Sequence, residues 1–246
     1  MECQGKVALI TGGRRVGAVV ALALARAGAD VALSYNRSRG EAEATAAEAR
    51  AAGRRAFIRQ ADLTDPVACR DLVAATAAEL GRLDILVSMA SVYARIPFEN
   101  LSASDLQHSF DVEVKSAFAC ALAAAPLMRA SGGGRIVTVS DWLAASARPR
   151  YTGFLHYYVA KKAVVGLTEA LALELAPDQI LVNAIAPGPI LPPPDLDDEE
   201  SKAVEQATPL GRWGGGEEIA KTVLALVESD FITGETIRVD GGRHVR

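Results

Sequence analysis

Residues 6–28 read "KVALITGGRRVGAVVALALARAG", and this stretch decides the fold class. Residues 6–11 are a short apolar run, which predicts a buried strand. Glycines follow at a turn, and a helical pattern then runs from Val16 to Ala27 and ends at Gly28. A strand that passes through a glycine turn directly into a helix is typical of an α/β sheet. We therefore expect this stretch to be the first βα unit of a parallel sheet.

The same alternation continues through the rest of the chain. Short β-branched runs predict further strands at residues 30–35, 55–61, 83–88, 134–140, 180–186 and 236–241. Alanine-rich patterns predict helices at residues 40–53, from 65 onward, and at 104–130, 157–176 and 217–228. Parallel sheets of this kind carry helices on both faces, so we expect one doubly wound Rossmann domain over residues 1–246. Ligands of such sheets bind outside the carboxyl ends of the strands, which is where the polar residues fall.

Composition narrows the function classes. The 246 residues are 50% hydrophobic, enough for one sizeable core. The net charge is −4 and the 26 basic residues form no dense cluster, which disfavours nucleic-acid binding. Three separated cysteines without a CxxC motif, together with scattered histidines, predict neither a disulfide framework nor a metal site. We read no signal peptide and no membrane span, and we expect a cytoplasmic protein with a small-molecule substrate.

The first glycine turn, "TGGRRVG" at residues 11–17, predicts a nucleotide phosphate site. Glycines there let the backbone approach a phosphate, and the helix N-terminus stabilises its charge. A tight structural turn is the alternative. The second strand ends in "SYNRS" and has no carboxylate to accept a ribose 2′-hydroxyl, which favours NADP(H) over NAD(H). The expected phosphate-side residues are Gly12, Arg14, Arg15, Val16, Gly17, Asn36, Arg37 and Ser38.

The stretch "HYYVAKK" at residues 156–162 contains two tyrosine–lysine pairs, each with a spacing of four. Helical steps from Lys161 meet an apolar stripe, whereas steps from Lys162 soon meet Glu169. This pattern favours Tyr157 and Lys161 as the pair that faces the pocket, with Tyr158 and Lys162 facing away, and the family resemblance described below implies the same choice, because "KKAVVGLT" matches when Lys161 is the active lysine. A nearby lysine is expected to lower the pKa of the Tyr157 phenol, so that it exchanges its proton more easily.

Taken together, several motifs resemble those of the short-chain dehydrogenase/reductase family over essentially the whole chain. They are "TGGRRVG", "ADL" (61–63), "LVSMAS" (86–91), "VTVSD" (137–141), "YYVAK" (157–161), "NAIAPGPI" (183–190) and "VDGG" (239–242). Within the family, the sequence is most similar to the pteridine-reductase-like branch and, more generally, to 3-oxoacyl-acyl-carrier-protein reductases.

The resemblance implies roles for particular residues. Tyr157 would protonate the substrate, and Lys161 would also contact the nicotinamide ribose. Asp141 stands at the position of the substrate-orienting serine, and Glu113 replaces an asparagine that helps to hold a relay water. Further cofactor contacts are implied for Asp62, Leu63, Ala90, Pro187 and Gly188. The resemblance also implies a homotetramer and a substrate loop at about residues 188–210.

Several assignments keep an alternative. Asp141 could instead cap a helix, and Asp62 could form an Asx turn. Tyr93, Trp142 and Tyr151 are either aromatic walls of the pocket or packing residues.

The sequence also departs from the family pattern. The glycine loop is one residue short, Ser88 and Met89 replace paired asparagines, and Asp141 precedes Tyr157 by an unusually long segment.

From these features we expect an NADP(H)-dependent oxidoreductase that reduces a carbonyl or a C=N group by hydride transfer. Pteridine-type and 3-oxoacyl compounds are the leading substrates. The alternative is a nucleotide-binding regulator or sensor with the same fold and little catalysis, an alternative that the departures at Ser88, Met89 and Glu113 keep open.

Overall fold

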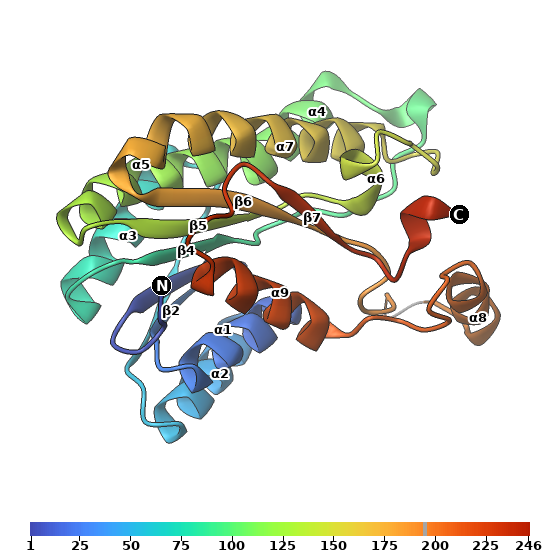
Figure 1. Ribbon diagram of the computed structural model, residues 1–246. Helices are drawn as coiled ribbons and strands as arrows, with labels where there is room; N and C mark the ends of the chain where they lie inside the picture. The colour runs from blue at the N-terminus through green and yellow to red at the C-terminus, as the bar shows by residue number, and fades with distance from the viewer. Residues whose placement is uncertain (194–195) are drawn as a thin grey trace.

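The computed structural model describes residues 1–193 and 196–246. Within these residues the strands form one parallel sheet in the order β3-β2-β1-β4-β5-β6-β7 (Figure 1). The strands are β1 (Val7–Thr11), β2 (Asp30–Tyr35), β3 (Ala56–Gln60), β4 (Ile85–Ser88), β5 (Gly134–Val139), β6 (Ile180–Pro187) and β7 (Thr236–Val239). The predicted fold class, a single doubly wound α/β domain, is confirmed.

Helices cover both faces of this sheet (Figure 1). One face carries α1 (Val16–Arg26), α2 (Arg39–Ala51) and α9 (Gly216–Glu228). The other carries α3 (Pro66–Leu80), α4 (Ala103–Phe110), α5 (Ser116–Ala130) and α7 (Leu155–Leu175). Two short helices, α6 (Trp142–Ala145) and α8 (Asp198–Gln206), follow the carboxyl ends of β5 and β6.

The core has one apolar cluster on each side of the sheet. Val20, Leu24 and Val223 of α1 and α9 pack against one face, on strand residues such as Ile10. On the opposite face, Leu72, Met128 and Ala172 of α3, α5 and α7 pack against strand residues such as Leu86. Because successive strand side chains point to opposite faces, a nearly continuous apolar strand can serve both clusters. All of β1 is buried.

Two predicted segments differ from the structure. The expected helix at residues 104–130 is interrupted by a π-helical turn, Asp111–Lys115, between α4 and α5. Such turns insert an extra residue per hydrogen-bonded ring and re-aim one side chain. Here the turn holds Glu113 in the interior. The segment expected to be a substrate loop, at about residues 188–210, contains the helix α8, whose N-cap Asp197 accepts a hydrogen bond from the Glu200 amide at 2.8 Å.

Candidate active site

The sheet order brings the predicted site residues to one edge. The strands are parallel, so the carboxyl ends of β1 to β6 all open toward the same side. Residues expected to hold the cofactor follow β1, β2, β3, β4 and β6, and those expected to act on the substrate follow β5 or lie on α7 and the π turn. The predicted site residues therefore gather at the carboxyl edge of the sheet.

The glycine loop has the close backbone packing that a phosphate cradle needs. Gly12 has a φ of +71°, and a Cβ there would lie 2.9 Å from the amide nitrogen of Ala90. A Cβ on Gly17 would lie 2.2 Å from the carbonyl oxygen of Gly12, so any side chain would force the turn apart. Val16 begins α1 directly after this turn. The shortened loop holds Arg15 at a positive φ of 52°, which is unusual for a residue with a side chain.

The arginines of this loop lie at the surface. Arg14 pairs with Glu41 at 3.3 Å, and both side chains are more than half exposed. Arg15 does not point back to the loop: its guanidinium donates to the carbonyl oxygen of Pro192 at 3.0 Å, on the segment that leads to α8. Arg37 is exposed after β2, next to the N-cap of α2 at Ser38. Arg15 thus links the cofactor loop to the predicted substrate loop.

The remaining cofactor-side residues occupy the expected strand ends. Asp62 forms an Asx turn, in which one oxygen accepts from the Thr64 amide at 3.0 Å and from its hydroxyl at 2.8 Å. These bonds hold the pKa of Asp62 below its usual value. Leu63 is buried and Ala90 packs against the glycine loop. Gly188 packs so closely on Asp240 that a Cβ would lie 2.5 Å from the Asp240 Cβ. Asp62 therefore forms the turn that the alternative interpretation predicted, and its side chain is exposed.

The lysines of the two tyrosine–lysine pairs separate as predicted, and Tyr157 lies beside Asp141. The Tyr157 hydroxyl donates to Oδ2 of Asp141 at 3.3 Å, and Lys161 is buried. Lys162 is exposed and donates to the Ala144 carbonyl oxygen at 3.2 Å. The stripe below Lys161 points inward: Leu171 is half-buried, and the other members, Val164, Val165, Thr168, Ala172 and Leu175, are buried.

Lys161 and Glu113 form a buried ion pair at the centre of the site. Their Nζ and Oε2 atoms are 2.7 Å apart, and the side chains are 2% and 1% exposed. The ammonium group also donates to the Val139 carbonyl oxygen at 2.7 Å. The other carboxylate oxygen, Oε1, accepts from the Ser91 hydroxyl at 2.5 Å and from the Val92 amide at 3.0 Å. Both oxygens of Glu113 are therefore satisfied.

Asp141 caps a helix, which is one of the two roles that the sequence allowed, and it also contacts Tyr157. Its Oδ1 accepts from the Leu143 amide at 2.8 Å and caps α6, while Oδ2 accepts from Tyr157. Desolvation by burial raises the pKa of Asp141, opposed by the Leu143 amide and by Lys161. The hydrogen bond that caps α6 therefore also fixes the Asp141 carboxylate beside the Tyr157 phenol.

The prediction of a lowered pKa for Tyr157 was wrong. Its pKa is raised well above 10, first by desolvation and then by the carboxylates of Asp141 and Glu113. Lys161 lies on the ring face, with Nζ 5.6 Å from the ring centroid, and its charge is neutralised by Glu113. The phenol is therefore strongly held in its protonated form.

The aromatic candidates divide between the site and the packing around it. Tyr93 contacts Tyr157 edge-on at a centroid distance of 5.0 Å and stacks on Phe154 at 4.6 Å. Trp142 is buried, and the guanidinium groups of Arg150 and Arg243 lie over its ring. Tyr93 thus forms a wall beside Tyr157, whereas Trp142 is a packing residue.

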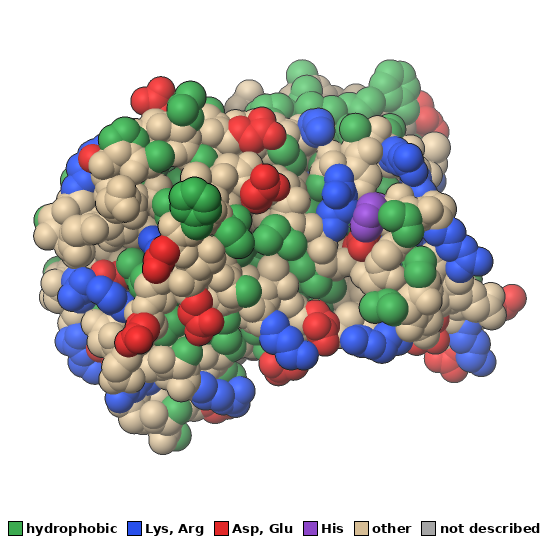
Figure 2. Space-filling view, in the orientation of Figure 1, with side chains coloured by type: hydrophobic (Ala, Val, Ile, Leu, Met, Phe, Trp, Pro, Cys, Tyr) green, Lys and Arg blue, Asp and Glu red, His purple; other side chains and the backbone are tan. Residues whose placement is uncertain are grey.

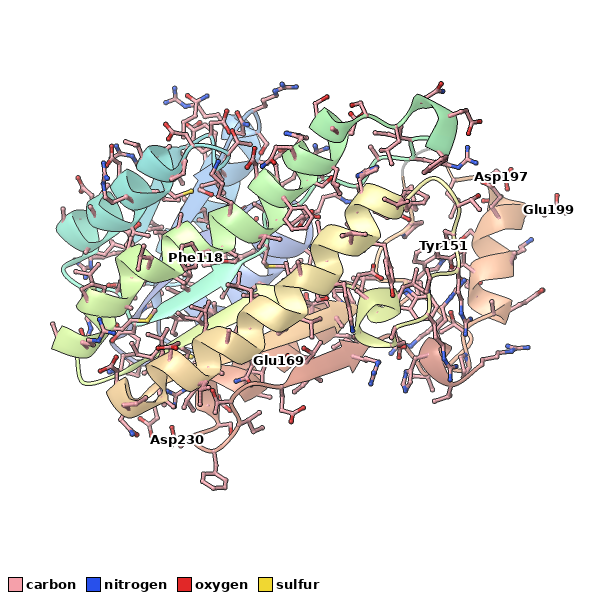
Figure 3. All side chains as sticks on the ribbon, turned by 90° about the horizontal axis from the view of Figure 1, so that it is seen from above. Phe118, Tyr151, Glu169, Asp197, Glu199 and Asp230 are labelled. Carbon is pink, nitrogen blue, oxygen red and sulfur yellow. The ribbon has the colours of Figure 1, made fainter. Side chains whose placement is uncertain are left out.

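Tyr151 belongs with Trp142. Its hydroxyl accepts from Arg243 at 3.1 Å, and Figure 3 places it at the end of α7 that faces α8. Arg243 also donates to the Val204 carbonyl oxygen on α8 at 2.9 Å. The C-terminal residues therefore tie the substrate loop to the segment before α7. A cavity of about 440 Å³ near the C-terminus does not include Tyr157 in its lining, which consists of residues 189–190, 208–210, 212, 214, 218, 238–242 and 244.

Sequence reasoning missed two residues of the site. Ser91 bonds to Glu113 across 22 positions of sequence, and Phe154 stacks on Tyr93 from the segment before α7. The only signal for Ser91 was its place in "LVSMAS", directly after the β4 strand. Nothing in the sequence spacing indicated that Phe154 would meet Tyr93.

Two further findings concern the charge on the surface and the character of the helices. Figure 2 shows basic and acidic side chains interspersed over the visible face. Within residues 1–193 and 196–246, none of the helices has both the length and the apolar character needed to cross a membrane.

Comparisons with known proteins agree with this geometry. The family model described as enoyl-(acyl carrier protein) reductase matches residues 13–244. An uncharacterized oxidoreductase of Mycobacterium tuberculosis is 42% identical, over 96% of this chain and 91% of the relative. A 3-oxoacyl-(acyl-carrier-protein) reductase of Staphylococcus aureus is 34% identical, over 98% of each chain.

Solved structures are equally similar. A short-chain dehydrogenase/reductase of Serratia marcescens superposes with a TM-score of 0.92 at 36% identity, covering 99% of this chain and 100% of that one. A blue fluorescent protein from a metagenomic library, in complex with NADPH, superposes with a TM-score of 0.89 at 34% identity, covering 99% of both chains. The full-length matches and the Tyr157–Lys161 site together show that the chain belongs to the short-chain dehydrogenase/reductase family of oxidoreductases.

Proposed function

We propose that the protein is an NADP(H)-dependent reductase of a carbonyl or C=N group. The observation that carries this proposal is the position of the Tyr157 hydroxyl, which donates to Asp141 at 3.3 Å at the carboxyl end of the sheet. A reduction needs a proton donor at the substrate oxygen or nitrogen, and a phenol, which is protonated at neutral pH, can be that donor.

The residues present fit a dinucleotide. The Gly12–Gly17 turn leads directly into the N-terminus of α1, where backbone N–H groups and the helix dipole suit a phosphate, and neither glycine tolerates a Cβ because the turn packs closely on Ala90 and on itself. Gly188 gives a similar close backbone approach after β6. When bound at this edge, a reduced nicotinamide supplies the hydride. Arg14, Asn36, Arg37 and Ser38 would hold its phosphate and ribose groups, with Asp62, Leu63 and Ala90 on the adenine side.

The preference for NADP(H) rests on charge. Arg14 and Arg37 are exposed at the ends of β1 and β2, and no carboxylate follows Tyr35 directly. A guanidinium group suits a 2′-phosphate, whereas a carboxylate there would suit a free 2′-hydroxyl. The similar metagenomic protein in complex with NADPH supports the same choice.

In the proposed reaction, Tyr157 donates its proton to the substrate and Asp141 positions the group that receives it. An ionised Asp141 only accepts hydrogen bonds, so it would suit a substrate that offers an N–H beside the reducible bond. Tyr93 supplies an aromatic wall on the same side. These features favour a pteridine-type substrate. A 3-oxoacyl substrate is the second candidate, because a 3-oxoacyl-(acyl-carrier-protein) reductase is among the relatives.

We also propose that the protein forms a homotetramer through α5 and α7. Both helices lie on the outer side of one sheet face, where Figure 3 shows Phe118 of α5 and Glu169 of α7. Phe118, Leu122 and Leu173 are exposed on these helices, at 45%, 64% and 78%. Large exposed side chains on neighbouring helices are typical of a subunit interface. Light scattering coupled to gel filtration would give the mass of the assembly.

The test of the function is a substrate panel with both cofactors. NADPH and NADH oxidation would be followed at the nicotinamide absorbance with dihydrobiopterin, a 3-oxoacyl thioester and a reactive quinone. The proposal expects turnover with NADPH in at least one class and a clear preference for NADPH over NADH. Tight NADPH binding without turnover in any class would favour the sensor alternative, and an NADH preference would overturn the cofactor assignment.

A further inference from the structure

Glu113 is the most unusual charged group in the site. It lies on the π turn before α5, its side chain is 1% exposed, and it contacts Lys161 at 2.7 Å. A buried carboxylate is costly unless every oxygen is bonded. Here Ser91 and Val92 bond one oxygen and Lys161 bonds the other. The chain has therefore built a complete set of partners for an ionised glutamate.

This pair sets the charge that Tyr157 experiences. Four titratable groups face the phenol: Asp141 from the cap of α6, Tyr93 from the loop after β4, Lys161 from its own helix, and Glu113 from the π turn. Lys161 is the only cation among these four. Its charge is cancelled at contact distance by Glu113, so the remaining field at Tyr157 is that of Asp141. A net negative field favours the protonated phenol.

We propose that Glu113 is a positioning residue that neutralises Lys161 and thereby keeps Tyr157 protonated through neutral and mildly alkaline pH. Glu113 also fixes the ammonium group, which is held between its carboxylate and the Val139 carbonyl oxygen. Ser91 anchors the carboxylate from the loop after β4. The inference rests on the proposed function, because it states when that site has a proton to donate. The raised pKa of Tyr157, to which Glu113 contributes after desolvation and Asp141, is consistent with it.

The test is a titration of the tyrosine protons in the full chain without cofactor. Carbon-13 labels at Cζ of tyrosine give one NMR signal per residue, and Tyr157→Phe identifies the Tyr157 signal by its loss. In the wild type this signal is expected to stay in the phenol position beyond about pH 10, the ordinary tyrosine value. In Glu113→Gln, the unpaired Lys161 charge is expected to lower its midpoint by about one to three pH units. An unchanged or higher midpoint would overturn the proposal.

A double variant keeps the test decisive if Glu113→Gln does not fold. Glu113→Gln/Lys161→Met removes both charges and leaves no buried ion unpaired. The Glu113–Lys161 pair has no net charge in the wild type, and the two residues that replace it in the double variant are uncharged. The Tyr157 midpoint of the double variant is therefore expected within about one pH unit of the wild type. If Lys161 instead acts as a net activator of Tyr157, removal of the pair raises the midpoint by more than this, and the proposal fails.

Turnover separates this inference from the proposed function. With an active substrate, the reduction rate of Glu113→Gln is expected to fall at lower pH than that of the wild type, by the shift seen in the NMR titration. A shifted midpoint in a protein that reduces nothing would refute the function and retain the role of Glu113. Turnover lost in Tyr157→Phe, with no shift in Glu113→Gln, would retain the function and refute the role of Glu113.

Discussion

The two ends of the active-site edge are built in opposite ways. At the cofactor end, Arg14 and Glu41 are 62% and 52% exposed and 3.3 Å apart. At the substrate end, Lys161 and Glu113 are 2% and 1% exposed and 2.7 Å apart. Exposed pairs contribute about 0–1 kcal/mol, whereas removal of one partner from a buried pair costs about 3–5 kcal/mol.

This difference indicates what each end has to do. Exposed arginines with weak partners can turn toward a phosphate at little cost, and solvent screens their charge until then. The substrate end must hold a proton in place, so its groups are fixed by burial and by several hydrogen bonds each. The following variants break or sharpen this contrast.

The largest effect is expected from Lys161→Met. This variant leaves the Glu113 carboxylate buried without its cation, so the free energy of unfolding should fall by about 3–5 kcal/mol. Glu113→Gln/Lys161→Met, which removes both charges, should lose much less. Urea denaturation of the three proteins measures the difference. If Lys161→Met and the double variant lose equal amounts of unfolding free energy, the unpaired Glu113 carboxylate is not the cause of the loss.

Arg37→Ala tests the cofactor end. Loss of a guanidinium group from the 2′-phosphate should weaken NADPH binding roughly ten-fold or more, because hydrogen bonds to charged groups contribute about 1.5–3 kcal/mol. NADH binding should not change. The control is Arg39→Ala, which removes a neighbouring exposed arginine that pairs with Glu43 at 2.8 Å. Titrations of cofactor fluorescence measure both affinities, and an equal loss for NADPH and NADH would refute the phosphate contact.

Asp141→Asn has a smaller effect on stability that depends on pH. Burial raises the pKa of Asp141 in the folded protein. At a pH above that raised pKa, the free energy of unfolding is lowered by the full cost of burying an ionised carboxylate. This cost fades as the pH falls toward about 3.9, the pKa of an aspartate in the unfolded chain. Asparagine also caps helices well. The variant should therefore be more stable than the wild type at pH 7 and equal to it near pH 4.

Thermal unfolding of Asp141→Asn across this range checks the sign. A variant that is less stable than the wild type at pH 7 would contradict the burial cost. In the proposed reaction the same variant should lose activity on the substrate that Asp141 positions, so stability and turnover are expected to change in opposite directions.

The smallest effect is expected from Arg14→Ala. Its exposed pair with Glu41 should contribute less than about 1 kcal/mol to the free energy of unfolding, and added salt should reduce even that. Denaturation at low and high ionic strength measures it. A loss comparable to that of Lys161→Met would mean that the two ends are not built differently.

Local pattern was enough to predict the sheet and most of the helices. Each strand lies within a residue or two of its β-branched run, because burial on both faces requires that composition. The orientation of α7 also followed from the sequence, because the stripe from Lys161 is apolar and the stripe from Lys162 reaches Glu169. The choice of Tyr157 over Tyr158 rested on the family resemblance of "KKAVVGLT", with which this stripe agrees.

The electrostatics of the site could not be predicted from local pattern. The pKa of Tyr157 depends on Glu113, which the π turn brings into the centre from 44 positions earlier in the chain. The Ser91 contact and the stack of Phe154 on Tyr93 likewise join segments that are far apart in sequence. Helix propensity over residues 104–130 gives no sign of the π turn, because the turn is set by its tertiary contacts. These contacts could be identified only from the folded structure.

The central claim is that Tyr157, and not its neighbour Tyr158, donates the proton. NADPH oxidation by the wild type, Tyr157→Phe and Tyr158→Phe, on the most active compound of the substrate panel, tests it most directly. Loss of general acid catalysis should lower kcat about 10²- to 10⁴-fold in Tyr157→Phe, with NADPH affinity retained and Tyr158→Phe close to the wild type. Equal activity in wild type and Tyr157→Phe, or loss only in Tyr158→Phe, would contradict the account.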